Sequence, residues 1–242
     1  MSGHSKWSKV KWQKAITDAK KSKIFSKIAR MISVAAKEKG PDPETNPKLR
    51  LAMEKARESN MPKDNVERAI KKGAGADEGA MLEEFIYEAY GPEGVALIIE
   101  GITDNKNRAL GEIKNILSRH QGKLASQGSV LWLFDHIGIL EYALGDNAQK
   151  DILELKAIEA GAQDIQEITD EGGAASLLVY AKPENLEKIK QTLEQADFNA
   201  KSFSLDWQAR EPVEVKAQDA IDKLLESLDE QDDINEIYSN LK

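Results

Sequence analysis

The chain has 242 residues, 34 of them basic and 42 acidic, which gives a formal net charge of −8, and 40% of the residues are hydrophobic. This length predicts two or three domains, and the hydrophobic content excludes wholesale disorder. The absence of cysteine excludes disulfides, thiolate metal sites and cysteine nucleophiles. No apolar run approaches the length of a membrane-spanning helix, and the N-terminus lacks a signal-peptide core, so we expect a soluble, cytoplasmic protein without membrane contact.

The two signs of charge are unevenly distributed along the chain. Residues 1–72 carry 19 basic and 8 acidic residues, a balance of +11, whereas residues 73–242 have a balance of −19. Such an asymmetry between segments points to contact of the basic part with nucleic acid or a membrane surface. The average charge conceals this division.

Residues 1–16 form an arm in which lysines alternate with tryptophans and polar residues. Lysines neutralise phosphates and release counterions, and indole rings stack on unpaired bases. The alternative is that the tryptophans hold the arm against the body of the protein while the lysines stay solvated. No other histidine lies at a metal-binding spacing from His4, so we expect it to donate a hydrogen bond within the arm or to a phosphate. The predicted nucleic-acid-binding residues of the arm are His4, Lys6, Trp7, Lys9, Lys11, Trp12 and Lys14.

A helix is predicted from Thr17 or Asp18 to Lys39, where Gly40 and Pro41 end it. Isoleucines recur along it at helical spacing and form one apolar face, and most of its cations fall on roughly the opposite face. We expect this cationic stripe to continue the binding surface of the arm. Its predicted nucleic-acid-binding residues are Lys20, Lys21, Lys23, Lys27 and Arg30.

Two shorter helices complete the basic domain. Asn46 and Pro47 read as N-cap and first position of a helix that ends near Ser59, and a third helix runs from Pro62 to Gly73. The glycine-rich stretch 73–80 then predicts a flexible linker. The first domain is therefore a three-helix basic domain over residues 1–75.

The periodicity after residue 80 is that of an α/β protein. Two strands (85–90 and 95–101), a helix (105–121) and a buried strand (130–134) are followed by an order of strand, helix, strand, strand, helix and strand over 137–205. The latter order is the split βαβ, or ferredoxin-like, pattern. A helix at 217–228 completes the earlier segment. The predicted fold class is α+β, with two ferredoxin-like α/β domains, one (136–205) inserted in the other (81–135 plus 206–242).

Two charged segments outside the basic domain admit two interpretations each. Asn105 is a natural N-cap, and the exposed amides beside Lys106 and Arg108 either accept a phosphate or belong to an ordinary capped helix with surface cations. The acid-rich C-terminus is either the solvated face of a terminal helix or a segment that folds against the basic domain and competes with nucleic acid. Its acidic residues are Glu226, Asp229, Glu230, Asp232, Asp233 and Glu236.

Catalytic and cofactor motifs are missing from the sequence. There is no phosphate-binding Walker loop, no G-x-S-x-G and no dinucleotide fingerprint, and His4, His120 and His136 share no metal-binding spacing. We therefore expect a protein that is not an enzyme and holds neither cofactor nor metal.

Four segments stand out as motifs: Met-Ser-Gly-His-Ser-Lys-Trp at 1–7, Asn-Met-Pro-Lys-Asp-Asn-Val-Glu-Arg-Ala-Ile at 60–70, Tyr-Glu-Ala-Tyr-Gly-Pro-Glu-Gly at 87–94 and Thr-Asp-Asn-Lys-Asn-Arg at 103–108. Together they resemble motifs of the YebC/PmpR family. The resemblance implies a three-domain cytoplasmic protein. Bacterial members of that family carry the name of probable transcriptional regulators that bind DNA, and mitochondrial relatives act in translational activation. Some bacterial members are also tied to the relief of ribosome stalling.

The combined expectation is a non-enzymatic regulator. The residues predict only a polyanionic partner for the basic domain, and the resemblance adds DNA and transcription. The alternative is a ribosome-associated translation factor or translational activator that binds RNA, because unpaired RNA bases suit stacking tryptophans. We expect a monomer whose acidic α/β domains contact protein partners.

Overall fold

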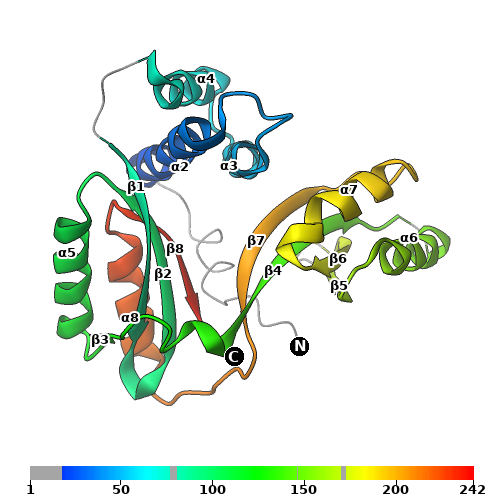
Figure 1. Cartoon of the computed structure of the whole chain (residues 1–242). Helices are drawn as coiled ribbons and strands as arrows, with labels where there is room; N and C mark the ends of the chain where they lie inside the picture. The colour runs from blue at the N-terminus through cyan, green and yellow to red at the C-terminus, as the bar shows by residue number, and fades with distance from the viewer. Residues whose placement is uncertain (1–17, 77–80, 146, 170–172) are drawn as a thin grey trace. The chain divides into compact units, whose positions relative to one another are not determined.

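The computed structural model describes residues 18–76, 81–145, 147–169 and 173–242 (Figure 1). The chain divides into two compact units, of which the second is His136–Trp207 and the first contains the segments up to Asp135 and from Gln208 onward. Each unit combines helices with a four-stranded sheet. The predicted α+β class is confirmed.

The basic part of the first unit contains α2 (Asp18–Lys39), α3 (Pro47–Glu58) and α4 (Lys63–Lys71), which confirms the three predicted helices. The side chain of Asn46 caps α3 by accepting a hydrogen bond from the N–H of Leu49 at 3.0 Å. Its amide also donates to the carbonyls of Ala35 and Gly40, each at 2.8 Å, so this buried side chain joins the end of α2 to the start of α3. The apolar core of the three helices consists of Ile28, Ile32, Ala35, Leu49, Ala52, Ala56, Met61 and Ala69.

The first residues of the predicted glycine linker are packed rather than flexible. Lys72–Ala76 continues α4 as a π-helical turn, and Gly73 lies directly against α2. A Cβ atom on Gly73 would lie 2.2 Å from the carbonyl oxygen of Ser33, so only glycine permits this approach. The linker prediction is therefore wrong for 73–76, while residues 77–80 lie outside the described residues.

The sheet of the first unit has the order β3-β1-β2-β8. Apolar side chains of α5 and α8 form the core with this sheet, and both helices lie on the same side of it (Figure 1). His120 ends α5, and its Nε2 lies 3.0 Å from the hydroxyl of Ser227 on α8. The elements are β1 (Glu83–Tyr90), β2 (Ala96–Thr103), α5 (Lys106–Arg119), β3 (Lys123–Leu124), α8 (Gln218–Asp229) and β8 (Ile234–Ser239).

The buried strand predicted at 130–134 is wrong. Leu131–Leu133 is a 3-10 turn, and the strand β4 (Phe134–Ala143) begins only after it. The cause is Glu88 on β1, a buried carboxylate that accepts hydrogen bonds from the backbone N–H groups of Gly128, Val130 and Leu131. These donors are therefore satisfied by a side chain and not by a neighbouring strand.

The predicted solvated face of a C-terminal helix is also wrong. Helix α8 ends at Asp229, and β8 pairs with β2 in antiparallel register, with a bulge at Gly101. At this bulge a Cβ atom on Gly101 would lie 2.1 Å from the carbonyl oxygen of Asp233 and 2.3 Å from the ring of Phe85. The absence of a side chain at Gly101 thus lets the segment before β8 approach the sheet.

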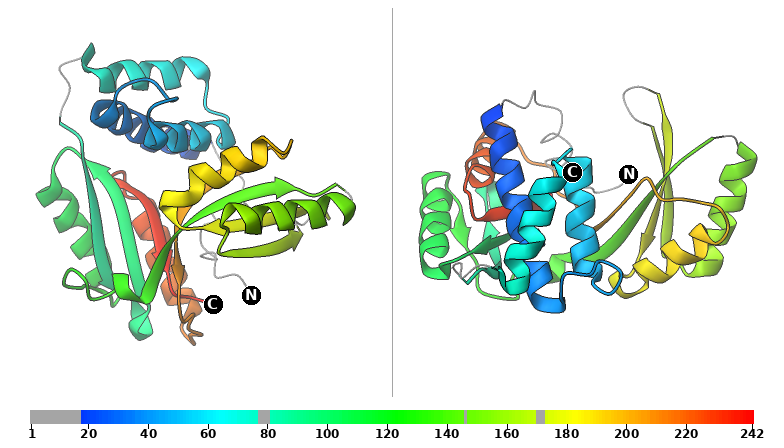
Figure 2. Two further views of the ribbon diagram at one scale, coloured as in Figure 1. Left: turned by 45° about the vertical axis from the view of Figure 1, so that its right-hand side comes forward. Right: turned by 90° about the horizontal axis from the view of Figure 1, so that it is seen from above.

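The second unit has the predicted order of strand, helix, strand, strand, helix and strand, and its sheet order is β5-β6-β4-β7. Both helices pack their apolar side chains against one face of the sheet (Figure 2). In the described part of the chain, no helix combines the length and the apolar character needed to cross a bilayer. Besides β4, the elements are α6 (Asn147–Ala160), β5 (Asp164–Thr169), β6 (Ala175–Ala181), α7 (Leu186–Glu194) and β7 (Ser202–Ala209).

The close approach at Gly101 gives a test of this packing. We expect Gly101→Ala to lower the free energy of unfolding by about 1–3 kcal/mol, because the new methyl group overpacks the core. Gly111→Ala is the matched control: Gly111 lies within α5 with nothing within 4 Å of the position of a Cβ atom, so the same change should stabilise the protein by up to about 1 kcal/mol. Urea unfolding of both variants measures the difference, and equal effects would contradict the packing argument.

Candidate nucleic-acid interface

The predicted nucleic-acid-binding residues fall into three groups in the structure. The seven residues of the arm, from His4 to Lys14, lie outside the described residues, and for Lys20 only the place in α2 is described. Lys21 lines a groove between α2 and α4. The other predicted residues, Lys23, Lys27 and Arg30 of α2 and Lys106 and Arg108 of α5, contact other parts of the first unit.

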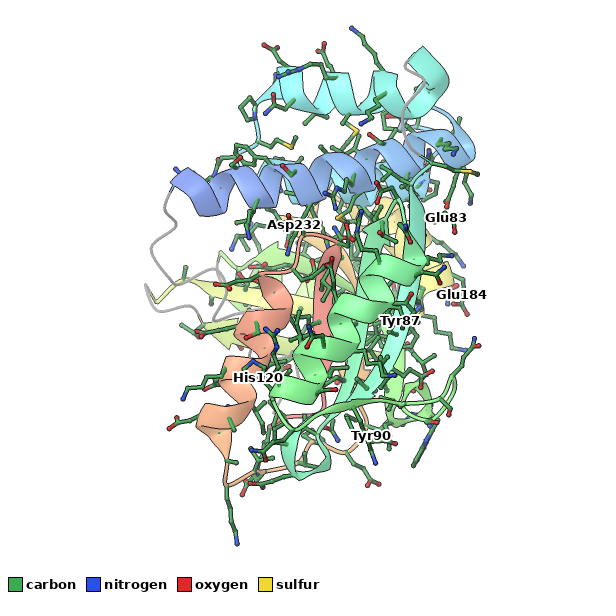
Figure 3. The ribbon with its side chains drawn as sticks, turned by 90° about the vertical axis from the view of Figure 1, so that its left-hand side faces the viewer. Glu83, Tyr87, Tyr90, His120, Glu184 and Asp232 are labelled. Carbon is green, nitrogen blue, oxygen red and sulfur yellow. The ribbon has the colours of Figure 1, made fainter. Side chains whose placement is uncertain are left out.

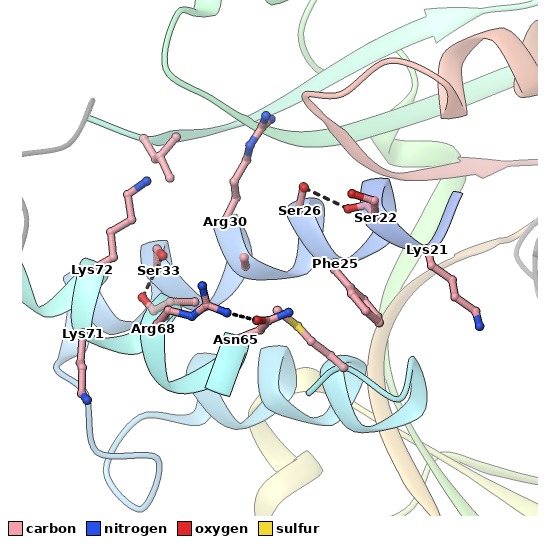
Figure 4. Close-up of a pocket in the computed structure, with 14 residues that line it drawn as sticks. Lys21, Ser22, Phe25, Ser26, Arg30, Ser33, Asn65, Arg68, Lys71 and Lys72 are labelled. Atoms are coloured by element: carbon pink, nitrogen blue, oxygen red, sulfur yellow. Dashed lines mark hydrogen bonds between the residues drawn. The ribbon is translucent and has the colours of Figure 1, made fainter. Parts of the chain in front are cut away.

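The groove between α2 and α4 is open and has a volume of about 1030 Å³ (Figure 4). Its apolar lining residues are buried or half-buried and form its floor, and hydroxyl groups, an amide group and five cations also line it. No carboxylate belongs to the described residues that line it. The apolar residues are Phe25, Ala29, Met61, Ala69 and Leu82, the neutral polar residues are Ser22, Ser26, Ser33 and Asn65, and the cations are Lys21, Arg30, Arg68, Lys71 and Lys72.

Local sequence explains why the cations gather there. On α4 and the turn that follows it, Arg68, Lys71 and Lys72 are three and four residues apart and so share one side of the helix, while Ala69 and Ile70 pack into the core. Lys21 and Phe25 are one turn apart on α2. The three cations Arg68, Lys71 and Lys72 were not among the residues predicted from the sequence, although their helical spacing was a signal for them.

The cations at the two ends of the groove are available to a ligand. Figure 4 shows Lys21 at one end, Lys71 and Lys72 at the other, and Phe25 and Arg68 between them. The three lysines are exposed, and no carboxylate of the described residues lies within 4.0 Å of their ammonium groups. Arg68 is oriented by its own helix, because it donates hydrogen bonds to the side chain of Asn65 and, at 3.2 Å, to the carbonyl of Asp64.

Lys23, Lys27 and Arg30 of α2 contact the acidic C-terminal segment. Lys23 donates to the carbonyl of Glu230 at 3.1 Å and Lys27 to that of Asp229 at 2.6 Å. These carbonyls follow the last turn of α8, where the helix dipole is negative, so the ammonium groups stabilise the end of that helix. Figure 3 shows the turn with Asp232 directly beside α2. Of the two interpretations of the acidic C-terminal segment, the structure therefore agrees with the one in which this segment folds against the basic domain.

Asp233 is the centre of this contact and is almost fully buried. It accepts hydrogen bonds from Arg30 at 2.9 Å, from Arg108 at 2.8 Å and from the hydroxyl of Thr103 at 3.0 Å. Burial alone would raise the pKa of Asp233, but the hydrogen bonds from Arg108 and Thr103 and the charges of Arg108 and Arg30 outweigh it, and the pKa is lowered. The carboxylate is therefore ionised and links α2, β2 and α5.

The N-terminus of α5 is a capped helix end. The side chain of Asn105 accepts a hydrogen bond from the N–H of Arg108 at 3.1 Å, which confirms the predicted N-cap. Arg108 also pairs with Asp104 at 2.7 Å, and Lys106 pairs with Glu83 at 2.8 Å. The hydrogen bond from Lys106 lowers the pKa of Glu83. Both cations predicted to hold a phosphate here are engaged by carboxylates, and phosphate binding at this end stays a prediction.

The contact at Asp233 predicts a large effect on stability. We expect Asp233→Ala to lower the free energy of unfolding by about 2–3 kcal/mol at pH 7, less than for a fully buried pair because both arginines are partly exposed. The folded-state pKa of Asp233 is lowered, so this stabilisation is complete above the unfolded-state pKa of about 3.9 and is lost as the pH falls through the folded-state value.

Asp232→Ala is the matched control for this prediction. Its side chain is 67% exposed and lies 3.7 Å from the ammonium group of Lys23, so its removal should cost less than about 0.5 kcal/mol. Thermal unfolding of both variants at pH 7 and pH 3 gives the comparison. If Asp233→Ala is destabilised relative to the parent protein as strongly at pH 3 as at pH 7, the charge of Asp233 is not the cause of its stabilising effect.

These features define a class: an α+β protein whose basic helical part carries a cationic groove and forms an ion pair with a buried carboxylate of the acidic C-terminal segment. Residues 5–76 match the family model of the TACO1/YebC protein N-terminal domain, and residues 82–241 match that of the TACO1/YebC second and third domain. The chain belongs to the TACO1/YebC family, which confirms the resemblance found in its sequence.

Relatives and a solved structure support this assignment along the whole chain. A protein of Fervidobacterium nodosum is 47% identical over 99% of this chain and 93% of its own length, and one of Pseudothermotoga lettingae is 44% identical over 100% and 94%. Both carry the name "Probable transcriptional regulatory protein". The crystal structure of a conserved hypothetical protein, Aq1575 from Aquifex aeolicus, is similar with a TM-score of 0.77 and 39% identity, covering 95% of this chain and 93% of that one.

Proposed function

We propose that this protein is a non-enzymatic regulator of transcription that binds DNA through its basic N-terminal part. One observation carries the proposal: the groove between α2 and α4 is lined by five cations and no carboxylate among the described residues, in a protein whose net charge is −8. Cations concentrated on one surface of an acidic protein are the electrostatic signature of phosphate binding. The names of the relatives supply the link to transcription.

The binding surface proposed from the structure is narrower than the stripe predicted from the sequence. Lys23, Lys27 and Arg30 have partners in the C-terminal segment, whereas Lys21, Lys71 and Lys72 are exposed cations of the groove. We therefore propose that the groove lysines, and not the paired cations of α2, contact the phosphates. Lys20 and the arm residues His4 to Lys14 complete the proposed surface, because they directly precede Lys21 in the chain.

The chemistry of the groove supports a binding role. Its described lining contains no carboxylate or histidine that would act as a general acid or base. Within the described residues, no group of three His, Asp or Glu side chains is arranged to hold a metal ion. We also propose the three-domain arrangement predicted from the sequence and a cytoplasmic location, with the acidic α/β domains open to protein partners.

The double variant Lys71→Gln/Lys72→Gln tests the proposed surface. Its affinity for a DNA duplex should fall about tenfold at 100 mM salt, because two cations that neutralise phosphates are removed. The slope of log affinity against log salt should become shallower by about 0.9 for each phosphate that is no longer neutralised. Fluorescence anisotropy between 50 and 200 mM salt measures both quantities.

The matched control is Lys182→Gln/Lys188→Gln, which removes two exposed lysines from the second unit and makes the same change in net charge. It should leave affinity and salt dependence nearly unchanged. An equal decrease in the two double variants would mean that net charge rather than the groove drives binding. A ribosome-associated role would instead be indicated by cosedimentation with ribosomes that survives DNase treatment.

A further inference from the structure

We propose that the groove between α2 and α4 binds an unpaired strand of nucleic acid, with one base against Phe25 and the flanking phosphates on the lysines at the two ends. This inference rests on the proposed function and specifies the form of nucleic acid that the groove takes. It is carried by the order of side chains along the groove: Lys21, then Phe25, then Asn65 and Arg68, then Lys71 and Lys72 (Figure 4).

The aromatic floor distinguishes this groove from a simple phosphate site. The ring of Phe25 is half-buried and lies among Ala29, Met61 and Ala69, so the floor is apolar. An apolar floor does not suit a phosphate, which loses its hydration there without gaining hydrogen bonds. A base has an apolar π-face, and stacking on aromatic side chains is the usual way in which proteins hold unpaired bases.

A duplex cannot use this floor. Its bases are stacked inside the double helix and its phosphates face outward, so an aromatic ring at the bottom of a groove between two helices reaches no base. A single strand exposes bases and phosphates alternately along one chain. The alternation of cations and an aromatic ring in the groove therefore matches a single strand better than a duplex.

Polar groups beside Phe25 fit the edge of a base. The carbonyl oxygen of the Asn65 side chain accepts a hydrogen bond from Arg68, so its amide group can donate to a base. The same contact holds the planar guanidinium of Arg68 at the groove, where it can stack on a second base.

The size of the groove agrees with a polymer segment. Its volume of about 1030 Å³ is at the upper limit of sites for small molecules, which span about 300–1,000 Å³ and enclose most of their ligand. This groove is open, so a strand can enter from one end and leave at the other. The exposed lysines at both ends would then contact phosphates on either side of the bound base.

The test compares three ligands of one sequence: a single-stranded DNA 12-mer, the corresponding RNA and the DNA duplex. Phe25→Leu keeps an apolar side chain of similar size but removes the ring. We expect its affinity for both single strands to fall about five- to tenfold, while its affinity for the duplex stays within twofold of the parent protein. Phe25→Tyr keeps the ring and should bind single strands like the parent protein, and thermal unfolding verifies that both variants are folded.

The outcomes separate this inference from the proposed function. If Phe25→Leu binds single strands like the parent protein, or loses affinity for duplex and single strands alike, the inference is overturned while binding of DNA stands. If the parent protein binds none of the three ligands, the proposed function fails as well. A selective decrease on single strands supports the inference, and a preference for RNA over DNA of the same sequence would then identify the 2′-hydroxyl as part of the recognised group.

Discussion

The buried carboxylate of Asp233 is the interaction on which the first unit depends. It accepts hydrogen bonds from Arg30 of α2, from Arg108 of α5 and from Thr103 at the end of β2. One side chain near the C-terminus thus joins α2 to the consecutive elements β2 and α5, which lie far from both in the sequence. A buried charge is costly unless it is paired and hydrogen-bonded, and these partners supply both. Gly101 makes the arrangement possible, because any side chain there would collide with the backbone of Asp233.

This contact separates the cations of α2 that are paired within the protein from the cations of the groove. Lys23 and Lys27 satisfy the carbonyls at the end of α8, and Arg30 neutralises Asp233, so their charge is used within the protein. The lysines of the groove have no such partner among the described residues. Arg30 belongs to both groups, since it also lines the groove. The position of the acidic segment thus determines which cations remain for a ligand.

The sequence predicted those parts of the fold that local signals determine. Helices α3 and α5 begin where an asparagine N-cap precedes them, and both caps are present in the structure. The strand predicted at 130–134 failed because its backbone partners are oxygens of Glu88, some 40 residues earlier in the chain. The strand β8 was missed because it is short and contains a charged residue, and only pairing with β2 makes it a strand.

The candidate site shows the same division between local and distant causes. Helical periodicity placed the cations of α2 on one stripe, but periodicity contains no information on which of them meet a carbonyl or carboxylate about 200 residues later. Arg68, Lys71 and Lys72 have an equally regular spacing, but they were not predicted as binding residues because they are only three. What makes them a candidate site is the groove that α4 forms with α2, and this is a property of tertiary packing alone.

An overall negative charge does not oppose phosphate binding at such a groove. At physiological salt the Debye length is about 8 Å, so exposed carboxylates farther away are largely screened. The buried carboxylate beside α2, that of Asp233, is neutralised by Arg30 and Arg108. Besides Arg30, whose charge is balanced by Asp233, four cations line the groove and set the local field that a phosphate meets there. The acidic remainder of the protein instead disfavours polyanions elsewhere on its surface, and this confines their binding to the basic part.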